Sequence, residues 1–111
     1  MSEYFLECAF LVPIRRDSRF SDGELHSTAA WDWLESELWV RYRGRTRPLE
    51  LYDGVYADKS GNAVQDLSRK YFIALREEQI DDLRELLREA KGVFYQECFY
   101  LSVRGHVEFV D

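Results

Sequence analysis

The chain has 111 residues, a formal net charge of −6 at pH 7 and a mean hydropathy of −0.44. This length suits one hydrophobic core, so we expect residues 1–111 to form a single α+β domain. No apolar run approaches the roughly 18 residues that a membrane span requires. The acidic balance also disfavours nucleic acid and anionic lipid as partners.

The chain starts Met1-Ser2-Glu3, without the basic segment of a secretory signal. Its two cysteines, Cys8 and Cys98, do not make a disulfide framework. We therefore expect a reduced, cytoplasmic protein.

The first predicted element is a strand over Tyr4–Val12, which ends at Pro13 because proline cannot donate to a strand ladder. Alternation places Cys8 on an apolar inner face and Glu7 on the outer face. A polar connection over residues 14–26 follows. It is longer than most connections, and long loops are either functional or mobile.

The second element is a helix that begins at Ser27 or Thr28, either of which can cap it, and ends near Gly44. Its apolar stripe includes Leu34 and Leu38, whereas Trp33 and Val40 lie off the stripe. A strand over residues 49–56 comes next, with Gly54 indicating a bulge. The connection over residues 58–62 predicts a hairpin.

The clearest pattern is a strand–helix–strand unit over residues 66–103, whose first strand has Tyr71, Ile73 and Leu75 on its apolar face. In its helix, the apolar residues occupy one arc and the acidic residues the opposite side, and Gly92 predicts the end. The following strand has Phe99 and Leu101 on one face and Cys98 and Tyr100 on the other. After it, Arg104-Gly105 either turns into a short last strand over residues 106–110 or bulges a longer one.

The resulting order, β-α-β-β-α-β, predicts a ferredoxin-like sandwich. It would have an antiparallel sheet of strand order 4-1-3-2, both helices on one face, and a possible short extra C-terminal strand. This topology brings three segments to one end of the sheet: residues 15–26, the hairpin at 58–62 and the junction at 91–96. The fold hosts many functions and does not select one.

The open sheet face is the first candidate site. We expect it to expose Glu7, Ala9, Lys70, Phe72, Cys98, Tyr100 and Ser102. Three interpretations stay open: an association surface, a solvated face in which Glu7 and Lys70 pair across strands, or a small-molecule pocket. For association, the candidate interface residues are Glu7, Phe72 and Tyr100, together with Trp33 as an exposed anchor.

The loop over residues 15–26 is the second candidate. Arg15 and Arg16 near a helix N-terminus could bind an anion, and His26 could act as a general acid or base. A merely solvated polar loop is the alternative. The candidate ligand-binding residues of the loop and the sheet face together are Arg15, Arg16, His26, Lys70, Cys98 and Tyr100.

Two further sets of residues could bind a ligand or a metal. Arg41, Arg43, Arg45 and Arg47 could bind phosphate, or could pair with Glu77, Glu78, Glu108 and Asp111 at a helix end. The cysteines and histidines have no metal-ligand spacing, so we expect no metal site and no cofactor.

The lack of a catalytic motif leads us to predict a homo-oligomeric interaction or regulatory module, with self-association as a homodimer. The alternative is a small enzyme or a domain that binds an anion or small ligand, with its site at the 15–26 loop and the open sheet face. The residues alone do not decide whether the protein is an enzyme or which ligand it binds.

Overall fold

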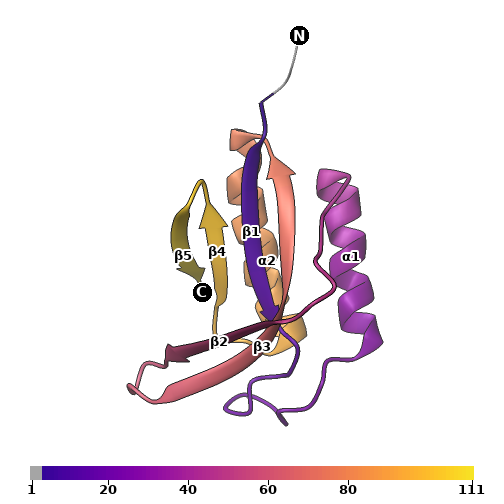
Figure 1. Cartoon of the computed structure of the whole chain (residues 1–111). Helices are drawn as coiled ribbons and strands as arrows, with labels where there is room; N and C mark the ends of the chain where they lie inside the picture. Colours follow the sequence, from indigo (N-terminus) through magenta and orange to yellow (C-terminus); the bar gives the residue numbers. More distant parts are fainter. Residues whose placement is uncertain (1–3) are drawn as a thin grey trace.

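The protein is described by a computed structural model covering residues 4–111. One antiparallel sheet of five strands is packed against two helices (Figure 1). In chain order the elements are β1 (Leu6–Pro13), α1 (Thr28–Tyr42), β2 (Tyr52–Ala57), β3 (Ala63–Leu75), a short 3-10 turn (Glu77–Gln79), α2 (Ile80–Phe94), β4 (Phe99–Val103) and β5 (His106–Val110). Neither helix within this described range is long and apolar enough to cross a bilayer.

The strand order is β2-β3-β1-β4-β5, which places β5 at the edge where the four-stranded prediction had β4. β5 pairs with β4 through a two-residue turn in which Arg104 and Gly105 both have positive φ, 53° and 78°. Two such residues form the turn that suits the twist of a hairpin. The separate last strand, one of the two readings of this segment, is therefore the one observed.

The core lies between the sheet and the helices. α2 buries every residue of its apolar arc, and α1 buries Ala30, Leu34 and Leu38. The sheet contributes alternate residues of its central strands: Cys8, Phe10 and Val12 from β1, Tyr71, Ile73 and Leu75 from β3, and Phe99 and Leu101 from β4. The predicted inner faces of these three strands are confirmed. The opposite face of the sheet carries no helix (Figure 1).

Several predicted boundaries were wrong. β3 begins at Ala63, three residues before the predicted strand–helix–strand unit, which starts at residue 66. Gly54 pairs in register with Asp66, so it does not form a bulge. The residues that cap the C-terminal ends of the helices in the left-handed region are Arg43 and Tyr95, not glycines. The backbone N–H of each cap donates to a carbonyl of the last helical turn.

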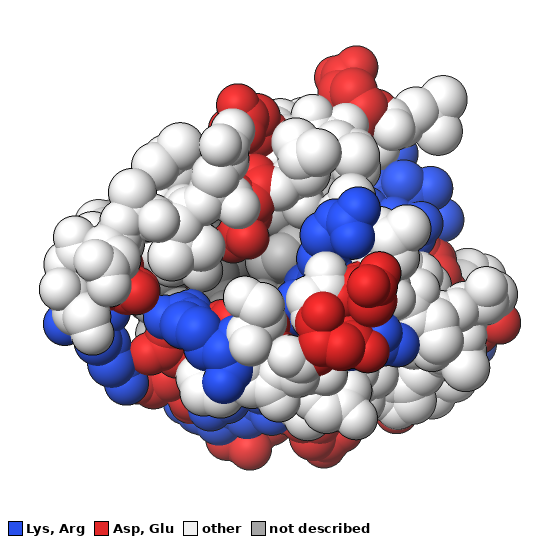
Figure 2. Space-filling model, turned by 90° about the horizontal axis from the view of Figure 1, so that it is seen from below, with Lys and Arg blue, Asp and Glu red and all other residues white. Residues whose placement is uncertain are grey.

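Two of the four arginines near the end of α1, Arg41 and Arg45, pair with acidic residues, although not with the predicted ones. Arg41 lies 3.1 Å from Glu37 and 3.0 Å from Asp82, and Arg45 lies 2.9 Å from Glu35. The predicted partner Glu108 pairs instead with Arg84 from α2, at 2.7 Å. Seen from below, the molecule shows both signs of charge side by side, without one broad basic patch (Figure 2).

Candidate functional site

The hairpin of β2 and β3 leaves the plane of the sheet and runs across the ends of β1 and β4 (Figure 1). The reason is the length of β3. Only its second part, from Ser68 onward, pairs with β1, and its first part has β2 as its one neighbour. A two-stranded ribbon twists more strongly than a wide sheet. The hairpin therefore curls over the open face, beyond the β1–β3 pairing.

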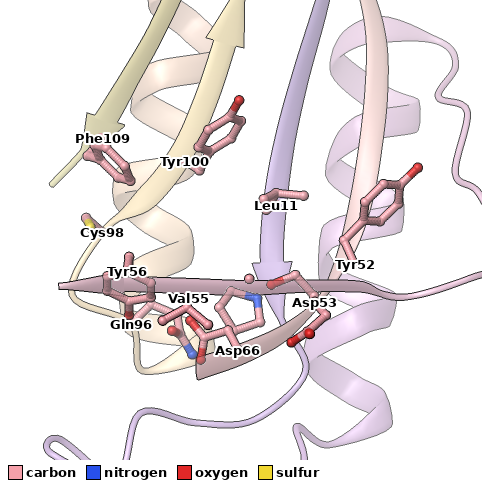
Figure 3. Close-up of a pocket in the computed structure, with 13 residues that line it drawn as sticks. Leu11, Tyr52, Asp53, Val55, Tyr56, Asp66, Gln96, Cys98, Tyr100 and Phe109 are labelled. Carbon is pink, nitrogen blue, oxygen red and sulfur yellow. The ribbon is translucent and has the colours of Figure 1, made fainter. Parts of the chain in front are cut away.

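Between this hairpin and the open face lies a pocket of about 330 Å³, which we call the open-face pocket (Figure 3). β1, β3 and β4 supply its floor, the hairpin its wall, and β5 one rim. Its lining residues are Leu11, Pro13, Tyr52, Asp53, Gly54, Val55, Tyr56, Asp66, Ser68, Gln96, Cys98, Tyr100 and Phe109.

Aromatic rings dominate this lining. Tyr52 and Tyr56 come from β2, and Tyr100 and Phe109 come from the β4–β5 pair on the other side (Figure 3). The Tyr100 and Phe109 rings meet edge to face, with their centroids 6.1 Å apart. Phe109 is 60% exposed to solvent. Flat aromatic surfaces on two walls suit a planar apolar group held between them.

The charged residues of the lining are both acidic, Asp53 and Asp66. Asp53 accepts a hydrogen bond from the Gln65 amide at 3.1 Å. Among the lining residues the structure describes, no lysine, arginine or histidine stands against these carboxylates. The lining residues therefore carry negative charge within largely apolar walls, which favours a cationic ligand.

Asp66 is half-buried in β3. Burial raises the pKa of its carboxyl group, and a hydrogen bond from Tyr56 opposes part of that shift. Burial, followed by the charge of Asp66, raises the pKa of Tyr56 to about 12. The residue opposite Asp66 across the ladder is Gly54, beside which a Cβ would meet nothing within 4 Å. This glycine leaves open space next to the carboxylate.

A smaller cavity of about 190 Å³ adjoins the pocket through Tyr56, Asp66 and Gln96, which line both. The 15–26 loop, including Arg15 and Arg16, forms most of its other wall, together with Val64 and Gln65 of β3. Gln96 is buried and donates to the Arg15 carbonyl at 2.8 Å and to the Phe94 carbonyl at 2.9 Å. The loop, the hairpin and the α2–β4 junction thus meet at one end of the sheet, as the topology predicts.

The predicted open-face residues divide between two hollows. Cys98 and Tyr100 line the open-face pocket, whereas Lys70, Glu7 and Phe72 line a separate hollow of about 360 Å³ that shares Tyr100. The Lys70 ammonium lies over the Phe72 ring, 4.9 Å from its centroid. Ion pairing between Glu7 and Lys70 is not found, because the cation faces aromatic rings instead.

His26 does not face the open-face pocket. It is buried, its Nε2 lies 2.7 Å from the Pro13 carbonyl oxygen, and its ring meets Trp31 and Phe94 edge to face. Burial lowers the pKa of His26, so the ring stays neutral near pH 7. A loop histidine available for proton transfer is therefore not what the structure shows. Its role as a ligand-binding residue stays a prediction.

Trp33 is half-buried against the core, and its ring centroid lies 6.5 Å from that of Phe94. The interface role given to it, and to Glu7, Phe72 and Tyr100, stays a prediction. No cluster of three or more metal-binding side chains occurs among residues 4–111.

Sequence reasoning missed most of the pocket: Tyr52, Asp53, Tyr56, Asp66 and Phe109. A signal was present in the hairpin. Tyr52, Gly54 and Tyr56 alternate along β2, opposite Ser68, Asp66 and Val64 in β3. Two strands of the ribbon therefore present a face with two phenols and a carboxylate. What alternation does not reveal is that this face turns back onto the sheet.

Comparison with known proteins finds no matching family model and no matching curated sequence. Two solved structures share the fold. One is a phage SAM lyase in complex with S-methyl-5'-thioadenosine, with a TM-score of 0.60 and 19% identity. The other is a phage SAM lyase in its apo state, with a TM-score of 0.57 and 18% identity. Each match covers 97% of this chain and 90% of the other.

At these identities the likeness shows a common fold. The main functional prediction, a homo-oligomeric interaction or regulatory module, was wrong, because both of these structures are of lyases and one of them holds a small molecule. The alternative, a small enzyme or ligand-binding domain with its site at the loop and the open sheet face, agrees better with the pocket and with these neighbours.

Proposed function

We propose that this protein is a lyase that binds S-adenosylmethionine in the open-face pocket and releases S-methyl-5'-thioadenosine. The observation that carries the proposal is the pocket itself: aromatic walls around two carboxylates, with no lining cation. The fold likeness, which extends over 97% of the chain, supports the same substrate class.

The nucleoside half of such a substrate is planar and polarizable. Stacking of a base on an aromatic side chain contributes about 1–3 kcal/mol in nucleic-acid complexes. Tyr52, Tyr56, Tyr100 and Phe109 offer such surfaces, and the pocket volume of about 330 Å³ is within the range of small-ligand sites.

The sulfonium half is a cation. Asp53 and Asp66 attract it electrostatically, and the faces of the tyrosine rings attract it through their quadrupoles. The product is a neutral thioether, so its sulfur is attracted neither by the carboxylates nor by the ring quadrupoles. The same groups that recruit the substrate would therefore release the product.

The bond that breaks follows from the product. S-methyl-5'-thioadenosine keeps the adenosyl and methyl groups, so the cleaved bond joins sulfur to the Cγ of the amino-acid chain. We infer that the substrate's own carboxylate oxygen attacks Cγ, and that the C–S electron pair passes to sulfur. The products are a neutral thioether and a lactone, and no proton is transferred. The opposite charges of the substrate cancel in this step, which an apolar pocket favours over water.

A β-elimination would need a base to remove a proton from Cβ. The side-chain carboxylates that line the pocket are weak bases for such a proton. We therefore assign Asp66 to holding the sulfonium, and Tyr56 to fixing the Asp66 carboxylate by a hydrogen bond.

The test is to incubate the purified protein with S-adenosylmethionine and to identify the products by chromatography and mass spectrometry. We expect S-methyl-5'-thioadenosine and the lactone in equal amounts. Asp66→Asn should lower kcat/KM at least tenfold, and Tyr56→Phe should lower it less. Arg45→Met, which alters an ion pair on α1, is the control. If the wild-type protein neither turns over the substrate nor binds S-methyl-5'-thioadenosine in calorimetry, the proposal fails.

A further inference from the structure

We propose that Arg19 is a positioning residue that clamps the β2–β3 hairpin over the open-face pocket. Its kinetic consequence rests on the proposed function, whereas the clamp itself does not. The proposal comes from the contacts of one guanidinium with three segments of the chain.

Arg19 contacts carboxylates from the loop, from the hairpin turn and from the α2–β4 junction. Its Nη2 lies 2.6 Å from Asp17 and 3.2 Å from Glu97, and its Nη1 lies 3.5 Å from Asp58. The Nε also donates to Asp17, at 3.0 Å. The contacts with Asp58 and Glu97 span long stretches of sequence, so they hold together parts of the fold that no ladder joins.

Asp58 is the residue through which this contact fixes the hairpin. Its carboxylate accepts hydrogen bonds from the backbone N–H groups of Ser60 and Asn62, both at 2.9 Å. Its carbonyl accepts another from Gly61 at 3.0 Å. Asp58 therefore organises the turn, and a cation that binds Asp58 holds the whole tip. At the other end of the clamp, Glu97 directly precedes Cys98 of the pocket lining.

The charge balance shows why this cation matters. The side chains of Asp17, Asp58 and Glu97 are only 10%, 9% and 18% exposed. Among the residues that the structure describes, the other lysine or arginine paired with this group is Lys59, which lies 3.3 Å from Glu97 and is 82% exposed. Without Arg19, three sheltered carboxylates would repel one another across the gap between the hairpin and the sheet. The hairpin would then move outward.

Such a movement would displace the groups that we assign to the substrate. Tyr56 lies two residues before Asp58, and Asp66 lies on the facing strand. Substrate binding would first have to close the hairpin again, which lowers the apparent affinity by the fraction of molecules that are closed. Once saturated, the site would be intact. Loss of the clamp should therefore raise KM more than it lowers kcat.

The first measurement is amide hydrogen exchange in Arg19→Met, Arg19→Lys and the control Arg45→Met. Arg45 is also a loop arginine, but it pairs with a helix carboxylate, Glu35 of α1, at 2.9 Å, rather than with the hairpin. We expect Arg19→Met to speed exchange about tenfold or more in residues 52–67, and less than twofold in β1 and α2. Arg19→Lys, which keeps the charge but not the fork, should be intermediate. Unchanged exchange in the hairpin, or equal acceleration throughout the chain, overturns the clamp.

The second measurement is steady-state kinetics with S-adenosylmethionine, together with calorimetric titration of S-methyl-5'-thioadenosine. For Arg19→Met we expect KM and the product Kd to rise about tenfold while kcat falls less than threefold. A fall in kcat with unchanged KM would contradict a positioning role. If the wild-type protein shows no turnover and no binding, but exchange in the hairpin still accelerates, the clamp stands and the proposed lyase function falls.

Discussion

At the scale of single residues, the most informative side chain is Asp66. Its carboxyl group is half-buried beside an empty space opposite Gly54, and burial raises its pKa. A raised pKa in a carboxyl means that folding disfavours its ionised form. Ionised Asp66 therefore costs stability at neutral pH, which is a common property of groups kept for function.

Asp66→Asn should accordingly stabilise the protein at pH 7 while it abolishes most activity. Because the folded pKa is raised, wild type has its full stability below the unfolded pKa and loses part of it as pH rises through the folded value. The amide keeps an acceptor for Tyr56 and carries no charge. We expect a gain of roughly 0.5–1 kcal/mol at pH 7, and a gain near zero at pH 3.5. Urea unfolding at both pH values measures it, and a destabilised variant at pH 7 contradicts it.

His26 provides a second prediction at this scale. Burial lowers the pKa of the ring, with Arg16 and Arg69 contributing in the same direction. The native state therefore keeps the neutral form, and stability present above the unfolded pKa is lost as pH falls through the folded one. Each pH unit between the two pKa values costs at most about 1.4 kcal/mol, and below the folded pKa no more is lost.

The measurement is urea unfolding of wild type and His26→Gln between pH 7.5 and pH 5. The variant should be less stable at pH 7.5, because the ring packs against Trp31 and Phe94. Its stability should also fall less steeply toward pH 5. Parallel curves for the two proteins would show that His26 does not titrate in this range.

At the scale of elements, the β2–β3 ribbon decides the site. Its first half has no third strand, so it twists away from the sheet and places one of its faces above β1 and β4. The residues on that face were visible as an alternating pattern. Their partner across the pocket, the Tyr100–Phe109 pair, comes from the opposite edge of the sheet.

Gly54→Val tests whether the face of the β2–β3 ribbon that carries Asp66 contacts the ligand. A Cβ at this position meets no atom within 4 Å, and the backbone is not in the left-handed region. Valine favours strands more than glycine does, so the fold should be unchanged or more stable. The added side chain should occupy the space beside Asp66 and weaken binding of S-methyl-5'-thioadenosine at least tenfold.

Calorimetric titration and thermal unfolding check the two halves of this prediction. Ala63→Val, at an exposed position of the same hairpin that does not line the pocket, is the matched control, and it should bind S-methyl-5'-thioadenosine like wild type. Loss of stability in Gly54→Val, or unchanged affinity, would mean that the pocket does not take the ligand at this wall.

α1 offers a test of the other element that carries the loop. The Ser27 hydroxyl accepts a hydrogen bond from the Ala30 N–H at 3.3 Å and caps the helix. Ser27→Ala should cost about 1 kcal/mol of unfolding free energy, and Ser27→Asp should retain the cap. Urea unfolding of the two variants separates the cap from a general effect of substitution, since equal losses would rule out capping.

At the scale of the whole molecule, the net charge of −6 and the acidic lining act in the same direction. Both favour a cation over a neutral molecule of the same shape. The distinction is measurable with S-methyl-5'-thioadenosine and its S-methylated sulfonium, which differ by one methyl group and one charge. Neither has the carboxylate needed for the reaction.

The sulfonium should bind about five- to tenfold more tightly at low ionic strength, since each partly exposed charge pair contributes on the order of 1 kcal/mol. The ratio should fall as salt is raised to 0.5 M, because exposed charges are screened. Asp53→Asn should lower the ratio and leave the affinity for the thioether unchanged. Equal affinities at all salt concentrations would remove the electrostatic basis of the proposed substrate class.

The periodicity of the chain by itself determined the two helices, the buried faces of β1, β3 and β4, and the shared end of the loop, hairpin and junction. These features depend on local spacing, because a 3.6- or 2-residue period fixes which side chains share a face. The site depended on the tertiary structure. Curling of the hairpin onto the open face brings Tyr56 and Asp66 opposite Tyr100, and it places Asp58 at the hairpin tip within reach of Arg19. Such contacts depend on strand twist and on packing between segments far apart in the chain, and neither produces a periodic pattern in the sequence.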